Sequence, residues 1–185
     1  MLLTKLVSRP IMIGTFGSIL IIDQFTKTLV RQQLALHEHV TVIPNLLDFR
    51  YVQNTGAAFG FLNSADIPFK AALMTAVALF ALIAIAIYAS HLSSEEPLAK
   101  LGLASILGGA TGNLIDRIMH GYVIDFIDWH WYNDFTWPTF NIADSAISVG
   151  VVLLLISSFK QEEENKPEIK IEVEPSSESN PYDNE

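Results

Sequence analysis

The chain has 185 residues, enough for one domain with a sizeable interior, and half of them are apolar. This composition is typical of a protein that crosses a membrane several times. The absence of cysteine excludes disulfides, thiolate metal sites and cysteine nucleophiles. The net charge is −9, and nothing in the sequence resembles a basic nucleic-acid-binding surface.

The first hydrophobic stretch, at about residues 10–29, predicts an uncleaved transmembrane helix. Lys5 and Arg9 precede it, as in a secretory signal, but no small-residue cleavage site follows the apolar run. Asp23 and Lys27 stand four residues apart near its end, with the acid first, which is the favourable order for an ion pair on a helix. A pair that orients the helix end is the simplest interpretation of these two residues.

A small β segment is predicted over about residues 38–63. Between residues 48 and 52, charged or aliphatic side chains alternate with aromatic ones, which is the period of a half-exposed strand. Asn54 and Gly56 follow and are typical of a turn. We expect a small extracytoplasmic sheet, a β-cradle, lying on the membrane surface.

Three further stretches predict transmembrane helices at about residues 71–90, 98–116 and 140–159. The stretch from 71 to 89 has no charged residue and suits the roughly 20 residues that a bilayer crossing needs. The other two have polar ends. Asn113, Asp116 and Arg117 end one of them, and Asn141 and Asp144 begin the other.

The remaining segments are a connection and a tail. Residues 161–185 hold nine acidic residues and two lysines, so they carry a net charge of −7 and leave only −2 on residues 1–160. We therefore expect one membrane domain over 1–160 and a disordered acidic tail over 161–185. The connection over 117–139 is expected as an interfacial loop because of its aromatic residues: Tyr122, Phe126, Trp129, Trp131, Tyr132, Phe135 and Trp137.

The polar helix ends converge on one membrane face if successive helices alternate in direction. The charge bias that sets the orientation is weak, because six basic residues then lie on the side of the N-terminus and five on the other. Lys5 and Arg9, next to the first helix, favour cytoplasmic termini and an outward-facing polar cluster. The overall prediction is an all-α polytopic membrane protein with four transmembrane helices, a β-cradle and an interfacial loop.

Carboxylates near lipid are functional candidates, because they are expensive to hold there. Two aspartates that share a proton where water can reach supply both an acid and a base for hydrolysis. His37 and His39 have no third ligand nearby, so no metal site is expected. Spacing alone does not choose the pair among the candidates Asp116, Asp125, Asp128, Asp134 and Asp144.

Two other functions compete with hydrolysis at this point. A small ion-coupled transporter also uses intramembrane aspartates, and a membrane scaffold would use the outer sheet and tail for docking. A transporter needs polar groups along a route across the membrane, whereas here they gather at one face. A scaffold leaves the paired aspartates without a role.

The chain resembles the signal peptidase II family, the lipoprotein signal peptidases of bacterial inner membranes. Each motif alone is weak, but their combination and order over about residues 10–160 are highly specific. The matching stretches are Asp23-Gln-Phe-Thr-Lys27, Asn54-Thr-Gly-Ala-Ala-Phe-Gly60, Gly108-Gly-Ala-Thr-Gly-Asn-Leu-Ile-Asp-Arg117, Gly121-Tyr-Val-Ile-Asp-Phe126 and Phe140-Asn-Ile-Ala-Asp-Ser145.

The resemblance implies an intramembrane aspartyl endopeptidase with Asp125 and Asp144 as its catalytic pair, without metal or cofactor. The implied substrate is a prolipoprotein whose cysteine bears diacylglycerol, cut just before that cysteine to release the signal peptide. The implied inhibitors are cyclic peptides of the globomycin type. The residues implied to support the site or bind substrate are Asp23, Lys27, Asn54, Gly56, Asn113, Asp116, Arg117 and Asn141.

Overall fold

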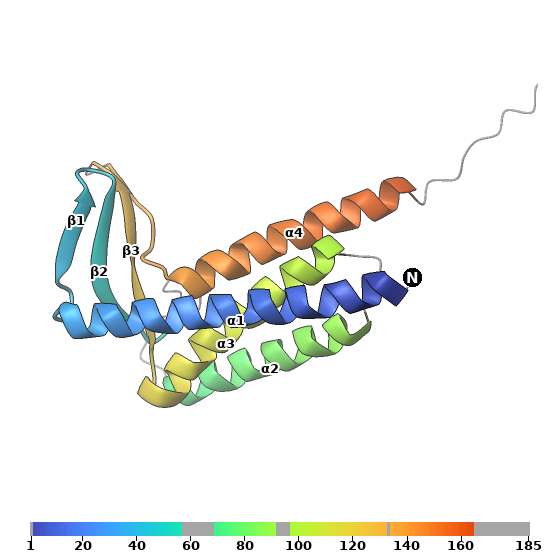
Figure 1. The fold of residues 1–185 in the computed structure, drawn as a ribbon. Coiled ribbons are helices and arrows are strands. Elements are labelled where there is room, and N and C mark those ends of the chain that lie inside the picture. The colour runs from blue at the N-terminus through green and yellow to red at the C-terminus, as the bar shows by residue number, and fades with distance from the viewer. Residues whose placement is uncertain (1, 57–68, 92–96, 133, 165–185) are drawn as a thin grey trace, which may run out of the picture.

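A computed structural model describes residues 2–56, 69–91, 97–132 and 134–164, which form four helices and one small sheet. The helices are α1 (Leu2–Gln33), α2 (Lys70–His91), α3 (Pro97–His120) and α4 (Ile142–Glu164). The strands are β1 (His39–Ile43), β2 (Leu47–Asn54), β3 (Val123–Trp131) and β4 (Phe135–Thr136). The helices lie side by side, and the sheet covers the end of the bundle where α1 ends and α4 begins (Figure 1).

Three of the helices are long and apolar enough to cross a membrane: α2 over Lys70–Ile87, α3 over its full length, and α4 over Ile142–Lys160. They match the stretches predicted at 71–90, 98–116 and 140–159. Helix α1 has the length for a span, about 48 Å for 32 residues. It is absent from the apolar set because every 18-residue stretch from Pro10 onward includes both Asp23 and Lys27.

Helix α3 is the central helix and contacts α1, α2 and α4. Its glycines allow the neighbouring backbones to approach closely, which is how membrane helices pack without large side chains. A Cβ added at Gly102 would lie 2.7 Å from the carbonyl oxygen of Gly150 in α4. A Cβ at Gly109 would collide with the carbonyl oxygen of Ala143 in the first turn of α4. The start of α4 is therefore held against the polar part of α3.

Replacing Gly109 with alanine should destabilise the protein, because the collision is with backbone and no side chain can swing away. We expect a loss of about 1–3 kcal/mol in the free energy of unfolding, the usual range for overpacking. Gly17→Ala is the matched control, since a Cβ there meets nothing within 4 Å. Unfolding in mixed detergent micelles measures both variants, and equal stability of the two would contradict this account of the packing.

The sheet is antiparallel in the order β1-β2-β3-β4. It differs from the prediction in one respect, because residues 117–139 were expected as an interfacial loop and instead supply β3 and β4. Phe126, Trp129 and Trp131 of this segment lie in β3. This strand pairs with β2 so that Val52 is opposite Asp125 and Asn54 is opposite Val123. The β-cradle is thus built from two distant parts of the chain.

Other predicted boundaries differ less. Helix α4 runs to Glu164, past the expected end at 159, because its last turns are made of good helix formers. Helix α1 likewise begins before residue 10 and ends after residue 29. The distal part of the β segment predicted over 38–63, from residue 57 on, lies outside the described residues, as does the expected disordered tail from residue 165 on.

The sheet is fastened to α1 by a small apolar core. Val30, near the end of α1, packs with Tyr51 of β2 and with Ile124 and Phe126 of β3, all of them buried. The pairing of β2 with β3 shifts register between Phe49 and Val52, so a bulge lies beside this core. This packing brings the first half of β3 over the polar ends of the helices.

Candidate active site

Asp144 lies in the first turn of α4, where a capping box holds it. Asn141 precedes the helix, and its Oδ1 accepts a hydrogen bond from the Asp144 amide at 2.9 Å. Asp144 Oδ2 accepts one from the Asn141 amide at 3.4 Å, so each residue satisfies the other's free N–H. The sequence Asn141-Ile-Ala-Asp144 thereby forms the start of the helix and orients the carboxylate together.

Asp125 lies in β3, and the same asparagine reaches it. Asn141 Nδ2 donates to Asp125 Oδ1 at 2.7 Å, and Asn54 Nδ2, from the end of β2, donates to Asp125 Oδ2 at 2.9 Å. One residue therefore contacts both carboxylates, through its side chain on one side and its backbone on the other. Asp125 and Asp144 are 2% and 9% exposed, so they form a buried pair.

Asn113 of α3 connects this pair to a buried cation. Its Nδ2 donates to Asp144 Oδ1 at 2.8 Å, while its Oδ1 accepts from Lys27 Nζ at 2.8 Å and from Asn141 Nδ2 at 3.2 Å. An ammonium group has only donors, so Lys27 determines which way the Asn113 amide points. That orientation in turn leaves an N–H group for Asp144.

Lys27 is the centre of an ion cluster that is almost wholly buried. Its Nζ lies 2.9 Å from Asp23 Oδ2 and 3.0 Å from Asp116 Oδ2. The side chain of Gln24 donates to Asp116 Oδ1 at 3.1 Å and to the carbonyl oxygen of Gly112 at the same distance. Gln24 was not among the predicted site residues, although it lies between two of them in the sequence. Its side chain is uncharged, so it does not stand out in a hydrophobic helix as Asp23 and Lys27 do. Only its position between these two residues indicated that Gln24 belongs to the site.

Each carboxylate of this cluster also holds the backbone beside one of the paired aspartates. Asp23 Oδ1 accepts the amide of Ala143, the residue before Asp144, at 3.0 Å. Asp116 Oδ2 accepts the amide of Ile124, the residue before Asp125, at 3.0 Å. Helix α1 and helix α3 thus position the two segments that carry the pair.

Arg117 and Gly56 hold the turn that follows β2. Arg117 Nη2 donates to the carbonyl oxygen of Gly56 at 3.0 Å, and the Gly56 amide donates to Asn54 Oδ1 at 2.9 Å. Within the described residues, Asp116 pairs with Lys27, whereas its neighbour Arg117 binds backbone oxygens.

All ten predicted site residues therefore join one connected network at the sheet end of the bundle. Two aspartates that spacing had left open do not join it. Asp128 lies farther along β3, where Arg50 contacts it, and Asp134 is exposed beside β4. An aspartate therefore joins the network because of its position in the fold, and not merely because it is an aspartate.

Burial and charge act on Asp125 in the same direction. Removal from water, followed by repulsion from Asp144, raises the pKa of Asp125 to about 7, against the hydrogen bonds from Asn54 and Asn141, which lower it. At neutral pH this carboxyl group is divided between its acid and its ionised form. That is the condition under which two neighbouring carboxyl groups act as acid and base.

The raised pKa of Asp125 makes stability depend on pH. Its folded pKa of about 7 exceeds the unfolded value of 3.8, so the folded state binds more protons between them. Its contribution to stability is fully present below about pH 3.8 and is lost as the pH rises through about 7. The free energy of unfolding of Asp125→Asn, relative to that of the wild type, should therefore rise by up to about 4 kcal/mol between about pH 4 and pH 8. Unfolding measured at both pH values tests this, and a difference independent of pH would contradict it.

A cavity of about 260 Å³, lined in part by α2, adjoins Asp144 and also Asn54, which donates to Asp125. Asn54, Asn113, Arg117 and Asp144 form its polar end. Its opposite wall is apolar and comes mainly from α2, a helix with the composition of a membrane span: Met74, Val77, Ala78, Ala81, Ala110, Val123 and Ile147. A ligand that is part polar and part lipid matches this division.

Known proteins share both the sequence and the fold. A family model described as Signal peptidase (SPase) II matches residues 15–160. The lipoprotein signal peptidase of Geobacter metallireducens is 46% identical over 143 residues, covering 77% of this chain and 86% of the relative. That of Syntrophotalea carbinolica is 40% identical over 158 residues, covering 84% and 95%. A solved bacterial membrane enzyme, determined by the in meso method at 2.3 Å, superposes with a TM-score of 0.72 at 29% identity, covering 86% of this chain and 94% of the other.

The match over residues 15–160 and the likeness of fold define the chain as a membrane peptidase. The chain belongs to the signal peptidase II family. The resemblance predicted from the five motifs is confirmed, and the transporter hypothesis finds no support in these comparisons.

Proposed function

We propose that this protein is an intramembrane aspartyl endopeptidase that removes the signal peptide from diacylglyceryl-modified prolipoproteins, cutting just before the lipidated cysteine. The observation that carries the proposal is the convergence of Asp125 and Asp144 on Asn141 at the sheet end of the bundle. The family membership supports a peptidase, and the relatives named lipoprotein signal peptidase support the substrate class.

In the proposed reaction the two aspartates share one proton. The ionised carboxylate takes a proton from water, and the resulting hydroxide equivalent attacks the scissile carbonyl while the protonated carboxyl donates its proton to the carbonyl oxygen. Collapse of the tetrahedral intermediate transfers a proton to the leaving amine, which is the amino group of the lipidated cysteine. Asn54, Asn113 and Asn141 hold the carboxyl groups for this exchange, which needs neither metal nor cofactor.

The cavity beside the pair supports a lipid-bearing substrate. Its polar end, with Asn54, Asn113 and Asp144, would bind the peptide, and its apolar wall on α2 would receive the acyl chains from the membrane. A diacylglyceryl group keeps the scissile bond close to the membrane surface, which is where a site at a helix end lies. Cyclic peptides of the globomycin type are expected to inhibit by binding at the same place.

We further propose that α1 is the fourth transmembrane helix. The charges that lower its hydropathy, Asp23 and Lys27, are paired and buried against α3 and do not face lipid. Four spans put both termini on one side. Lys5 and Arg9, near the start of α1, favour the cytoplasm for them, so the aspartate pair would lie at the periplasmic face of a bacterial inner membrane. Residues 1–160 then form the membrane peptidase domain, followed by the acidic tail.

Cleavage of a defined precursor in nanodiscs tests this function. The expected result is one cut just before the lipidated cysteine, found by mass spectrometry of both products, with little cleavage of the matched precursor that lacks the diacylglyceryl group. Activity should be unchanged by a chelator. Equal cleavage of the unmodified precursor would refute the substrate class, and loss of activity in chelator that zinc restores would refute the two-aspartate mechanism.

A further inference from the structure

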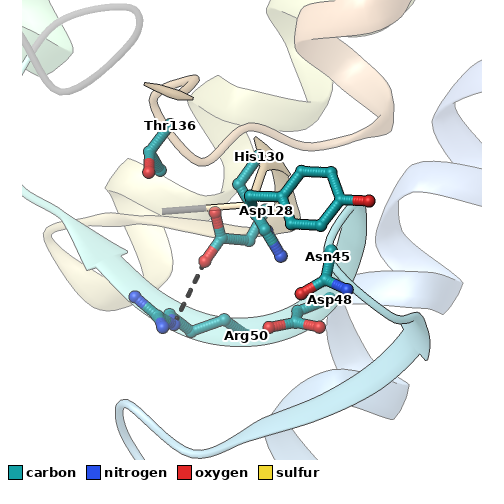
Figure 2. A pocket seen from close by; sticks show the side chains of 7 residues that line it. Asn45, Asp48, Arg50, Asp128, His130 and Thr136 are labelled. Atoms are coloured by element: carbon teal, nitrogen blue, oxygen red, sulfur yellow. Dashed lines mark ion pairs between the residues drawn. The ribbon is translucent and has the colours of Figure 1, made fainter. Parts of the chain in front are cut away.

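A second cavity, of about 300 Å³, lies at the far end of the sheet from the active site. Its walls come from β2, β3 and β4 and from the turns next to them, and nearly every one of its side chains is polar (Figure 2). It is formed by Asn45, Asp48, Arg50, Asp128, His130, Tyr132 and Thr136. The proposed peptidase chemistry uses none of these residues.

Two aspartates on neighbouring strands line this cavity together. Asp48 and Asp128 are directly opposite in the pairing of β2 with β3, where like charges destabilise a sheet. They are only 8% and 3% exposed, and Oδ1 of each is buried without a hydrogen-bond partner. Arg50 Nε lies 3.2 Å from Asp128 Oδ2, but without the geometry of a hydrogen bond. Among the described residues, the pocket therefore has two carboxylate oxygens without hydrogen-bond donors, and one negative charge that no cation balances.

Unpaired buried acceptors call for a positively charged donor, because a buried polar atom without a partner is costly. A bound metal ion fits poorly: no set of three or more potential metal-binding side chains gathers in the part of the chain that the structure describes, and Arg50 would repel the ion. An organic ammonium group offers up to three N–H donors to the two carboxylates. Arg50, 42% exposed, and His130 lie at the rim and suit an anionic group next to that ammonium.

The position of the cavity favours a lipid as the source of this ligand. The strands run across the helix axes, and the end of the sheet that holds the β1–β2 turn and the β3–β4 hairpin stands clear of the helices (Figure 1). The hairpin exposes Trp131, Tyr132 and Phe135, and such rings prefer the headgroup level of a membrane. Tyr132 also lines the cavity. A pocket at this depth, beside the bundle, faces phospholipid headgroups.

We propose that this pocket binds the headgroup of a phospholipid that carries a primary ammonium group, of the phosphatidylethanolamine type. Asp48 and Asp128 take the ammonium group, while Arg50 and His130 take the phosphate. The bound lipid supplies the donors that the two carboxylates lack and fastens the outer end of the sheet to the membrane. This site is separate from the Asp125 and Asp144 pair and stands whether or not the proposed peptidase function holds.

The test is the binding of matched lipids to the full chain in detergent, followed by native mass spectrometry. Phosphatidylethanolamine and phosphatidylcholine with the same acyl chains have the same charge and differ only at the nitrogen, where three methyl groups replace the three N–H donors. We expect the wild type to bind the ethanolamine lipid about tenfold more tightly, and Asp48→Asn and Asp128→Asn each to reduce the preference to within about twofold, since a charge-assisted hydrogen bond supplies at least that factor. Asp134→Asn, an exposed change on the same hairpin, should keep the full preference.

Several results would overturn the proposal. If the wild type binds the two lipids equally well, the proposal is refuted without reference to any variant. It is also refuted if the preference for the ethanolamine lipid survives both asparagine substitutions. If free phosphoethanolamine binds as tightly as the lipid, the ligand is a soluble zwitterion. If a lysine-containing substrate peptide displaces the lipid, the pocket serves a polypeptide. Thermal unfolding checks that the variants remain folded, and Asp48→Asn should be at least as stable as the wild type because it relieves the repulsion between two buried carboxylates.

Discussion

Replacing Asp125 or Asp144 with asparagine is expected to lower kcat for cleavage of the lipidated precursor by about 10²–10⁴-fold, the range for loss of general acid–base catalysis. Asparagine has nearly the shape of aspartate and can still meet Asn141, but it can neither take a proton from water nor pass one on. The capping box at the start of α4 and the pairing of β3 with β2 should persist. The variants should therefore fold and bind substrate, with KM changed much less than kcat.

The controls separate a chemical role from a structural one. Asp134→Asn changes the same residue type outside the network and should cleave at the wild-type rate. The double variant should lose little more than either single one, because residues that act as one unit are not additive. Near-normal cleavage by Asp125→Asn or Asp144→Asn would remove that residue from the proposed mechanism, even if the family assignment stands.

The helices could be predicted from the sequence because the bilayer imposes a length and a composition on them. The stretch that became α2 is apolar from residue 71 to residue 89, and α3 and α4 are apolar between their charged ends. Helix α1 was the hard case, since Asp23 and Lys27 look out of place in a membrane span. These charges are tolerated because Lys27 forms ion pairs with Asp23 and with Asp116 of α3. The contact with α3 is a tertiary contact, which a hydropathy profile cannot predict.

Strand β3 could not be predicted, for a related reason. Its partner β2 lies more than 70 residues away in the sequence, and its aromatic residues suit an interface as well as a strand. Without that pairing, five aspartates were equivalent, and only the family resemblance chose Asp125. The geometry now gives a physical reason for the choice, because Asp125 lies opposite Val52, at the end of the sheet that covers the helix ends.

The network explains why a pair of acids can be held in this place. Asp23 and Asp116 hold the amides of Ala143 and Ile124, and Lys27 compensates both of these carboxylates. Asn113 and Asn141 then bring only neutral groups to Asp144 and Asp125. The full positive charge lies one step back from the pair, so the backbone is fixed strongly without an ion bound directly to either carboxyl group. In the proposed mechanism, this separation leaves the proton shared by the two aspartates free to move.

Replacing Lys27 with methionine is therefore expected to damage stability and activity together. The change keeps the length of the side chain but leaves Asp23 and Asp116 buried without their cation. Breaking a buried ion pair in this way costs about 3–5 kcal/mol, which unfolding in mixed detergent micelles will measure. Adding Asp23→Asn should restore part of the loss, because one buried negative charge is then removed with the positive one.

Arg31→Met is the matched control, since it removes an exposed cation four residues farther along α1 whose hydrogen-bond partner is His120. It should change stability by no more than about 1 kcal/mol, as is usual for exposed charges. In Lys27→Met the Asn113 amide also loses the group that orients it, so kcat should fall even where the protein remains folded. A Lys27→Met variant as stable and as active as Arg31→Met would show that the buried cluster is not what positions Asp125 and Asp144, and the scaffold would have to be sought in the packing of α3 against α4 alone.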